Sequence, residues 1–251
     1  MNIGIIGTGA VGSPLARNLA AAGHNVKVTN TRPFAELTEK AQSLGASPAT
    51  IEDVVKDVDI VFISVPFGAI PKFPKDLFRS LPDQVIVADT GNYYPFRDEK
   101  IDALEQGQVE SVWVAQQLGR PITKAFNNLL SETIAAGGKP EGTPGRIALS
   151  IAGDDQNAKQ VVAGLANELG FEVVDGGTLA DSWRQQPGTP AYCTELTAAE
   201  LTAAIDEAVP GKAPQIRDEI IGELVQRKSM PTREEMVAGN RARQLGKSGG
   251  L

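Results

Sequence analysis

Three glycines near the amino terminus, Gly7, Gly9 and Gly12, constrain the fold of this chain more than any other feature. They follow the largely apolar residues 3–6 at the spacing with which a strand turns sharply into a helix. Gly7 permits the turn, Gly9 lets a pyrophosphate approach bare backbone, and Gly12 lets the helix pack closely on the strand. The pattern predicts a helix over residues 11–22 whose N-terminus, with its free amides, faces the phosphates of a bound nucleotide.

The length of this unit favours a dinucleotide site over a merely structural glycine turn. The strand, the turn, the helix and a second strand at 26–29 together span about 30 residues, the length of one βαβ unit. We expect the turn to contact the cofactor through six consecutive residues, namely Gly7, Thr8, Gly9, Ala10, Val11 and Gly12.

The residues after the second strand favour NADP(H) over NAD(H). An NAD-binding chain usually carries Asp or Glu there to accept a hydrogen bond from the ribose 2′-hydroxyl, but this chain has Asn30. Thr31 and Arg32 instead supply a hydroxyl and a planar cation, which suit a 2′-phosphate. We expect Pro33 at the first position of the next helix. The alternative is that Arg32 is a solvated surface residue.

Composition limits the possible classes of protein. The chain has 251 residues, 41% of them hydrophobic, which allows one sizeable core and a small appendage. A formal net charge of −7 without a basic run argues against binding to nucleic acid or to an anionic membrane. Cys193 is the only cysteine, and no apolar stretch approaches the roughly 20 residues of a membrane-spanning helix. We therefore expect a soluble, cytoplasmic protein.

Apolar runs and helical patterns alternate through the first 190 residues. We predict further strands at 59–64, 84–89, 122–126, 146–152 and 172–174, a helix at 157–169, and a short helix opened by a capping box at 50–53. This alternation predicts an α/β fold with a Rossmann-type, doubly wound, mainly parallel sheet. Ligands of such sheets bind at the carboxyl ends of the strands, where the chain carries Ser64, Val65, Pro66, Phe67 and Asn92.

After residue 190 the pattern changes to short helices separated by proline and glycine. Capping boxes begin at Thr197 and Thr232, and residues 216–225 carry apolar side chains at helical spacing. We divide the chain into an NADP-binding domain, residues 1–190, and a helical C-terminal extension, residues 191–251. Its last residues, 247–251, should fray. Because short segments cannot hide this apolar surface alone, we expect the extension to wrap the main domain or to form a homodimer.

Seven segments occur together in this chain: residues 7–12, 30–33, 64–66, 89–94, 124–128, 152–155 and 175–177. With them, the chain resembles the NADPH-dependent reductases of the deazaflavin coenzyme F-420 and their bacterial relatives over residues 1–192. It resembles more distantly the cytosolic NADPH-flavin domain of membrane metalloreductases. The resemblance implies direct hydride exchange between NADPH and a second planar cofactor, a deazaflavin or a flavin. Residues 182–190 resemble the bacterial relatives and not clearly the archaeal deazaflavin reductases, which leaves the second substrate open.

The side chains available are compatible with hydride transfer that needs little acid-base work. His24, the only histidine, lies in the turn before the second strand, so we expect a spectator. Asn127 and Lys124 are candidates for contact with the hydride acceptor, although a lysine beside a strand more often snorkels from a sheet edge. Trp183 is a candidate for either a ligand contact or a dimer contact. Asp155 suits a helix cap better than a metal site, and no His or Cys cluster supports metal binding.

The sequence is also compatible with two other functions. An imine or small carbonyl reductase related to pyrroline-carboxylate reductase would share the NADPH half, although this chain lacks a long helical domain to build such a substrate pocket. A non-enzymatic NADP-sensing protein would bind the cofactor without consuming it.

Overall fold

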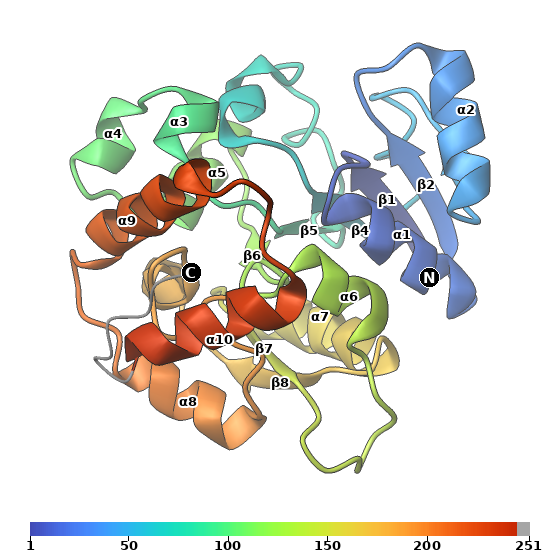
Figure 1. Cartoon of the computed structure of the whole chain (residues 1–251). Helices are drawn as coiled ribbons and strands as arrows, with labels where there is room; N and C mark the ends of the chain where they lie inside the picture. Colours follow the sequence, from blue (N-terminus) through green and yellow to red (C-terminus); the bar gives the residue numbers. More distant parts are fainter. Residues whose placement is uncertain (245–251) are drawn as a thin grey trace.

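The order of the strands is that of a doubly wound nucleotide-binding sheet. The computed structural model describes residues 1–244, and its larger sheet has six strands paired in parallel in the order β3-β2-β1-β4-β5-β6 (Figure 1). The chain moves outward from β1 to β3 and then returns to place β4 on the other side of β1. The carboxyl ends of β1 and β4 therefore form the switch point at which sheets of this kind bind ligands.

The described residues form short strands joined mostly by helices. The strands are β1 (Asn2–Ile6), β2 (Asn25–Thr29), β3 (Ser47–Pro48), β4 (Ile60–Ile63), β5 (Ile86–Asp89), β6 (Thr123–Lys124), β7 (Ala148–Ile151) and β8 (Glu172–Asp175). The α-helices are α1 (Gly12–Ala21), α2 (Phe34–Ser43), α3 (Pro95–Asp98), α4 (Asp102–Glu105), α5 (Glu110–Leu118), α6 (Ser131–Ala136), α7 (Gln156–Glu168), α8 (Ala198–Asp206), α9 (Ala213–Gln226) and α10 (Arg233–Gln244). Two segments are 3-10 helices, η1 (Phe67–Lys72) and η2 (Leu179–Gln185).

Both faces of the larger sheet are buried. In β4, Ile60 and Phe62 belong to the same apolar cluster as Leu15 of α1. The intervening Val61 belongs to a second cluster with Trp113 of α5. Consecutive side chains of a strand point to opposite faces, so an unbroken apolar run is what a strand covered on both sides requires.

Three sequence predictions about local structure are wrong. The capping contact at Thr50 forms, with Asp53 N donating to Thr50 Oγ1 at 3.1 Å, but residues 51–57 make turns and bends because Asp57, at φ +52°, directs the chain into β4. Pro33 precedes α2, which begins one residue later than predicted. The strand predicted at 122–126 is only two residues long, because Phe126 adopts φ +60° and leaves the extended region.

β7 and β8 form a separate two-stranded parallel sheet. An antiparallel bridge connects it to β6: Lys124 N donates to Ala152 O at 2.8 Å, and Ala152 N donates to Lys124 O at 3.0 Å. The two parallel sheets are thus joined through a single antiparallel residue pair. This arrangement agrees with the predicted mainly parallel fold.

The C-terminal helices pack on the main domain. Leu201 and Ile205 of α8 pack in an apolar cluster with Ala148 of β7. The guanidinium of Arg217, on α9, lies 5.4 Å from the centroid of the Tyr93 ring in the main domain. In Figure 1, α8, α9 and α10 lie on the side of the molecule opposite α2. The tail at 247–251, predicted to fray, lies outside the described residues.

Candidate functional site

The glycine turn after β1 has the backbone conformation that the sequence predicts. Gly7 has φ +104°, and its N–H donates to Thr29 O at 2.8 Å. A Cβ at Gly7 would lie 2.1 Å from Ser64 O, and a Cβ at Gly12 would lie 2.0 Å from Gly7 O. Close packing therefore requires glycine at both positions.

Gly9 differs from its neighbours because the space beside it is open. A Cβ at this position would meet nothing within 4 Å. Ala10 is also exposed, Thr8 and Val11 are partly exposed, and the first turn of α1 carries no acidic side chain. Backbone amides exposed at a helix N-terminus attract phosphate, so this turn fits the pyrophosphate of a dinucleotide.

Asn30 links the glycine turn to the loop that follows β2. Its Nδ2 donates to Thr8 Oγ1 at 2.7 Å, and its Oδ1 accepts from Arg32 N at 2.9 Å. The Arg32 guanidinium is 69% exposed and lies 3.8 Å from a Glu36 oxygen, which makes a weak contact at such exposure. Thr31 is exposed as well. Thr31 and Arg32 are thus both open to a phosphate, and Asn30 fixes the loop that carries them.

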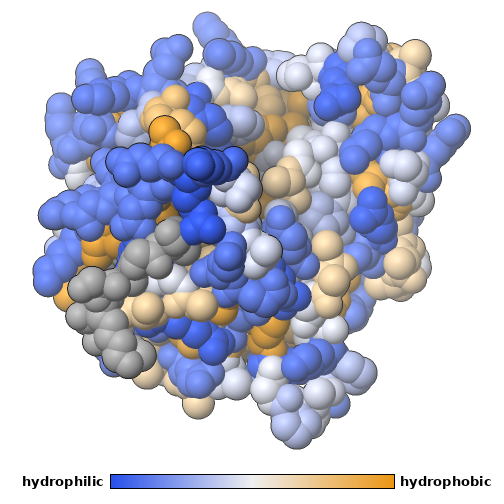
Figure 2. Space-filling view, in the orientation of Figure 1, coloured by the Kyte–Doolittle hydropathy of each residue, from blue (hydrophilic) through white to orange (hydrophobic). Residues whose placement is uncertain are grey.

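The end of β4 lies beside the glycine turn. Ser64 N donates to the carbonyl of the last residue of β1 at 2.8 Å. Ser64 and Val65 are partly exposed and Pro66 is exposed, so these three are available to a ligand. Phe67 is fully buried and stacks on Trp113 with ring centroids 5.6 Å apart, so it supports this loop from the core. Figure 2 shows a hollow near the middle of the molecule whose floor is paler and more orange than its mostly blue rim.

Lys124 does not snorkel from a sheet edge as the sequence suggests. It is 1% exposed, and its Nζ donates to Asp89 Oδ2 at 2.6 Å and to Gly91 O. Asp89 Oδ1 in turn accepts from Gly91 N at 2.9 Å. The Lys124 ammonium also lies 5.6 Å from the centroid of the Phe67 ring. The buried ion pair connects β6 to the end of β5, and the bond to Gly91 O extends this link to the following loop.

Asn127 is held by hydrogen bonds at the end of β6. Its Nδ2 donates to Asn92 Oδ1 at 3.0 Å and to Gln185 O at 2.9 Å, while its Oδ1 accepts from Gln185 Nε2 at 2.7 Å. Asn92 Nδ2 completes the link by donating to Asn127 O at 2.9 Å. Phe126, just before it, is buried in the left-handed region, a strained conformation that tends to occur at functional sites. Asn127 thus positions the partly exposed Asn92 beside the strand ends.

The other two residues singled out from the sequence lie elsewhere. Trp183 lines a cavity formed with Tyr93 and Arg217, not with the residues of the glycine turn, and the Arg184 guanidinium lies 4.8 Å from its ring centroid. His24 lies at the opposite, amino-terminal side of β2, where its Nε2 contacts Glu168 Oε2 at 2.7 Å. The structure thus brings the glycine turn, Arg32, Ser64 and Asn92 to one end of the sheet and leaves Trp183 and His24 away from them.

Gln185 is a positioning residue that sequence reasoning missed. It is 1% exposed, its Nε2 donates to Asn127 Oδ1 and Ser150 O, and its Oε1 accepts from Ser150 Oγ at 2.8 Å. The only signal in the sequence is the polar run at 182–190, which does not distinguish Gln185 from the neighbouring Gln186. Its role follows from partners 35 and 58 residues away along the chain.

Two further features of the described residues bear on the class of protein. None of their helices combines the length and the apolar character needed to cross a bilayer. No cluster of three or more His, Cys, Asp or Glu side chains among them is placed to hold a metal ion.

Comparisons with known proteins agree with a nucleotide site at this end of the sheet. Residues 2–93 match the family described as "NADP oxidoreductase coenzyme F420-dependent". The solved structure of hypothetical protein SMa0349 from Sinorhizobium meliloti is 32% identical, with a TM-score of 0.66 over 78% of this chain and 95% of that chain.

Two curated Escherichia coli (strain K12) proteins are also similar. The protein YjhV is 38% identical over 103 residues, which cover 41% of this chain and 75% of that protein. The 3-sulfolactaldehyde reductase is 27% identical over 252 residues, which cover 82% of this chain and 83% of that protein.

Proposed function

Because the chain belongs to the coenzyme F420-dependent NADP oxidoreductase family, we propose that it transfers hydride between NADPH and a planar redox acceptor, a deazaflavin or flavin coenzyme. The family places the chain among NAD(P)-dependent oxidoreductases. The preference for NADPH and the class of acceptor are the parts that this proposal adds.

The observation that carries the proposal is the open backbone at Gly9 beside the cation of Arg32. The free space over Gly9 fits a pyrophosphate at the N-terminus of α1. The loop after β2 holds Arg32 exposed and has an amide, Asn30, where a carboxylate would repel a 2′-phosphate. The residues present therefore fit NADPH better than NADH.

The chain's own contribution to the reaction would be positioning. NADPH supplies a hydride and is released as NADP⁺, while the acceptor takes up the hydride and a proton from solvent. Asn92 and Asn127 fix the backbone at the ends of β5 and β6, and the buried ion pair of Lys124 with Asp89 ties the two strand ends together. Holding two reactants in a fixed orientation lowers the barrier without any acid-base residue.

The direct test is NADPH oxidation against a panel of acceptors. With deazaflavin, FMN, FAD, quinones, cyclic imines and small aldehydes offered separately, we expect turnover with deazaflavin or a flavin and faster reaction with NADPH than with NADH. NADPH binding without oxidation by any acceptor would contradict the proposal and indicate an NADP-sensing protein.

A variant at Asn127 tests whether positioning limits the reaction. Asn127→Ala removes the side-chain bonds to Asn92 and Gln185, so acceptor-dependent turnover should fall about 10-fold or more while the Kd for NADPH changes little. Steady-state kinetics and NADPH titration separate the two effects. Asn25→Ala, at the exposed start of β2, serves as the matched control and should leave both quantities unchanged.

Reduction of a small carbonyl compound is the second candidate function. Its support is the similarity over most of the chain to 3-sulfolactaldehyde reductase. In the same panel, oxidation of NADPH by carboxylate-bearing aldehydes, but not by flavins, would favour this function.

A further inference from the structure

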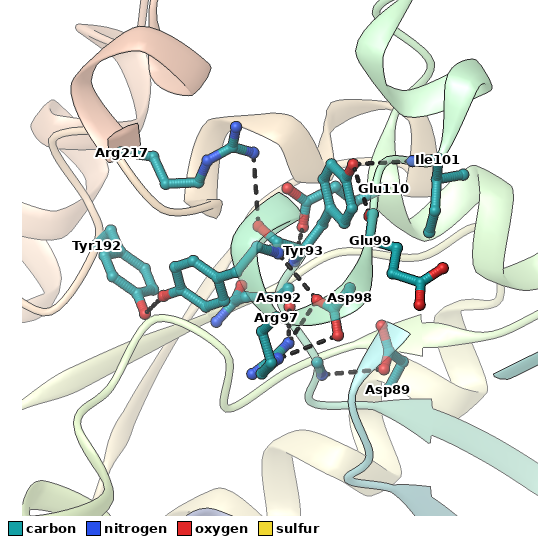
Figure 3. Close-up of polar contacts among 12 residues, drawn as sticks. Asp89, Asn92, Tyr93, Arg97, Asp98, Glu99, Ile101, Glu110, Tyr192 and Arg217 are labelled. Atoms are coloured by element: carbon teal, nitrogen blue, oxygen red, sulfur yellow. Dashed lines mark hydrogen bonds and ion pairs between the residues drawn. The ribbon is translucent and has the colours of Figure 1, made fainter. Parts of the chain in front are cut away.

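A second cavity lies apart from the glycine turn, between the start of α5, η2 and the first turns of α9. Its volume is about 280 Å³, just below the usual range of about 300–1,000 Å³ for small-molecule sites. Two charged side chains line it, Glu110 and Arg217, with Trp183 and Pro214 among the apolar parts of the wall. Figure 3 shows that Glu110 and Arg217 approach Tyr93 from two different helices.

Glu110 brings a buried carboxyl group to this cavity. The residue is 6% exposed, and its Oε2 accepts from Tyr93 N at 3.1 Å. Its other oxygen, Oε1, has no hydrogen-bond partner among the described residues. Burial raises the pKa of Glu110 to about 7, although the nearby Lys124 opposes that rise. Since Oε1 is not fully enclosed by the protein, water or a ligand in the cavity can bind it.

Arg217 brings a buried cation to the same cavity. It is 5% exposed, its Nε donates to Asp218 Oδ1 at 2.8 Å, and its Nη1 makes only a long contact of 3.5 Å to Tyr93 O. Its Nη2 has no hydrogen-bond partner within residues 1–244. Arg217 is ion-paired through Nε with the exposed Asp218, but it forms no ion pair with Glu110 in this part of the chain. The Nη atoms of Arg217 and the Oε1 atom of Glu110 are therefore left for a ligand.

From this arrangement we propose that the cavity binds a small apolar α-amino acid. Its carboxylate would bind the Arg217 guanidinium, and its ammonium group would bind the Glu110 carboxylate. Its side chain would pack on the apolar wall near Trp183 and Pro214. A ligand with one charge satisfies only one of the two buried groups, whereas a zwitterion of this size satisfies both.

Calorimetric titration of the whole chain, without NADPH, tests this proposal independently of any reductase activity. The probes are L-leucine, L-methionine and L-phenylalanine, with 4-methylpentanoate and 3-methylbutylamine as leucine analogues that lack the ammonium or the carboxylate. We expect at least one amino acid to bind with a Kd of about 1 mM or tighter. Each leucine analogue should bind about 10-fold or more weakly than leucine.

Substitutions assign the binding to this cavity. Arg217→Met and Glu110→Gln should each weaken amino-acid binding about 10-fold or more, because each removes one charged contact. Glu219→Gln, at an exposed position on α9, is the matched control and should bind as the unmodified chain does.

The proposal is overturned if none of the three amino acids binds at about 10 mM. It is also overturned if 4-methylpentanoate binds as tightly as leucine, or if both cavity variants bind normally. The analogue series on the unmodified chain decides the question even if a cavity variant fails to fold.

Discussion

At the scale of single residues, the choice of nucleotide depends on Asn30 and Arg32. A hydrogen-bonded contact between Arg and phosphate is worth about 1.5 to 3 kcal/mol, which corresponds to roughly 10- to 150-fold in affinity. We expect Arg32→Ala to weaken NADPH binding by that factor and to leave NADH binding nearly unchanged. Fluorescence titration of both nucleotides measures the difference.

Glu36, on the helix that follows Arg32, offers a control for this prediction. Its contact with Arg32 is exposed, so Glu36→Gln should leave NADPH affinity unchanged or slightly higher. Equal losses for NADPH and NADH in Arg32→Ala, or tighter NADH binding by the unmodified chain, would contradict the assignment.

Glu110 should make the stability of the protein fall as the pH rises. Burial raises its pKa in the folded state from 4.5 to about 7, so the folded state binds more protons than the unfolded state between these values. The penalty develops across this window and reaches about 3 kcal/mol above it. We therefore expect Glu110→Gln to gain stability relative to the unmodified chain between about pH 4 and about pH 8, by about 3 kcal/mol. Urea unfolding of both proteins at the two pH values measures this gain. A stability difference between the two proteins that does not change with pH would contradict this prediction.

Residues with local signals were predictable, and residues with distant partners were not. The glycines follow from a spacing of a few residues, and the helix cap at Asp155 follows from its position, with Oδ1 accepting from Asn157 N at 2.8 Å. The ion pair of Lys124 with Asp89 and the bonds of Gln185 depend on side chains 35 or more residues away. The sequence alone does not show which distant residues come into contact. Lys124 was therefore expected to be an exposed lysine at a sheet edge.

At the scale of elements, the spacing of apolar residues and the helix-capping residues predicted most of the strands and helices. The apolar runs became parallel strands in the doubly wound order, and capping boxes at Thr197 and Thr232 open α8 and α10. The same signal at Thr50 produced only turns and bends, and Asp57 leaves the helical region before β4 begins. Local propensity therefore predicted the start of an element better than its length.

A single residue of η2, Gln185, should contribute to the stability of the protein. Gln185→Ala leaves Asn127 Oδ1, Ser150 O and Ser150 Oγ without the bonds that Gln185 makes to them. Buried polar atoms without partners cost about 1–3 kcal/mol each, so for three atoms we expect the free energy of unfolding to fall by at least about 3 kcal/mol. Urea denaturation measures this loss. Gln186→Ala, one residue away and partly exposed, should change it by less than about 1 kcal/mol.

At the scale of the whole molecule, the C-terminal helices pack on the main domain but leave apolar side chains outside. Ile216 and Ile220 are partly covered within the chain, whereas Val225 and Met230 are 78% and 76% exposed. We still expect a homodimer that covers this exposed surface. Light scattering at micromolar concentration should give twice the chain mass of 26.5 kDa, and Val225→Asp should reduce it to a single chain mass. A monomer in the unmodified protein would mean that the internal packing of these helices is sufficient.

The bridge between Lys124 and Ala152 has a mechanical consequence. β1 and β4 are joined over four residue pairs, but β7 and β6 meet at one pair with two backbone hydrogen bonds. A load pulling the two sheets apart would rupture this joint before it separated β1 from β4. The bridge is also the place in the backbone where a small rotation would move β7, β8 and α8 relative to the glycine turn without disturbing a longer strand pair.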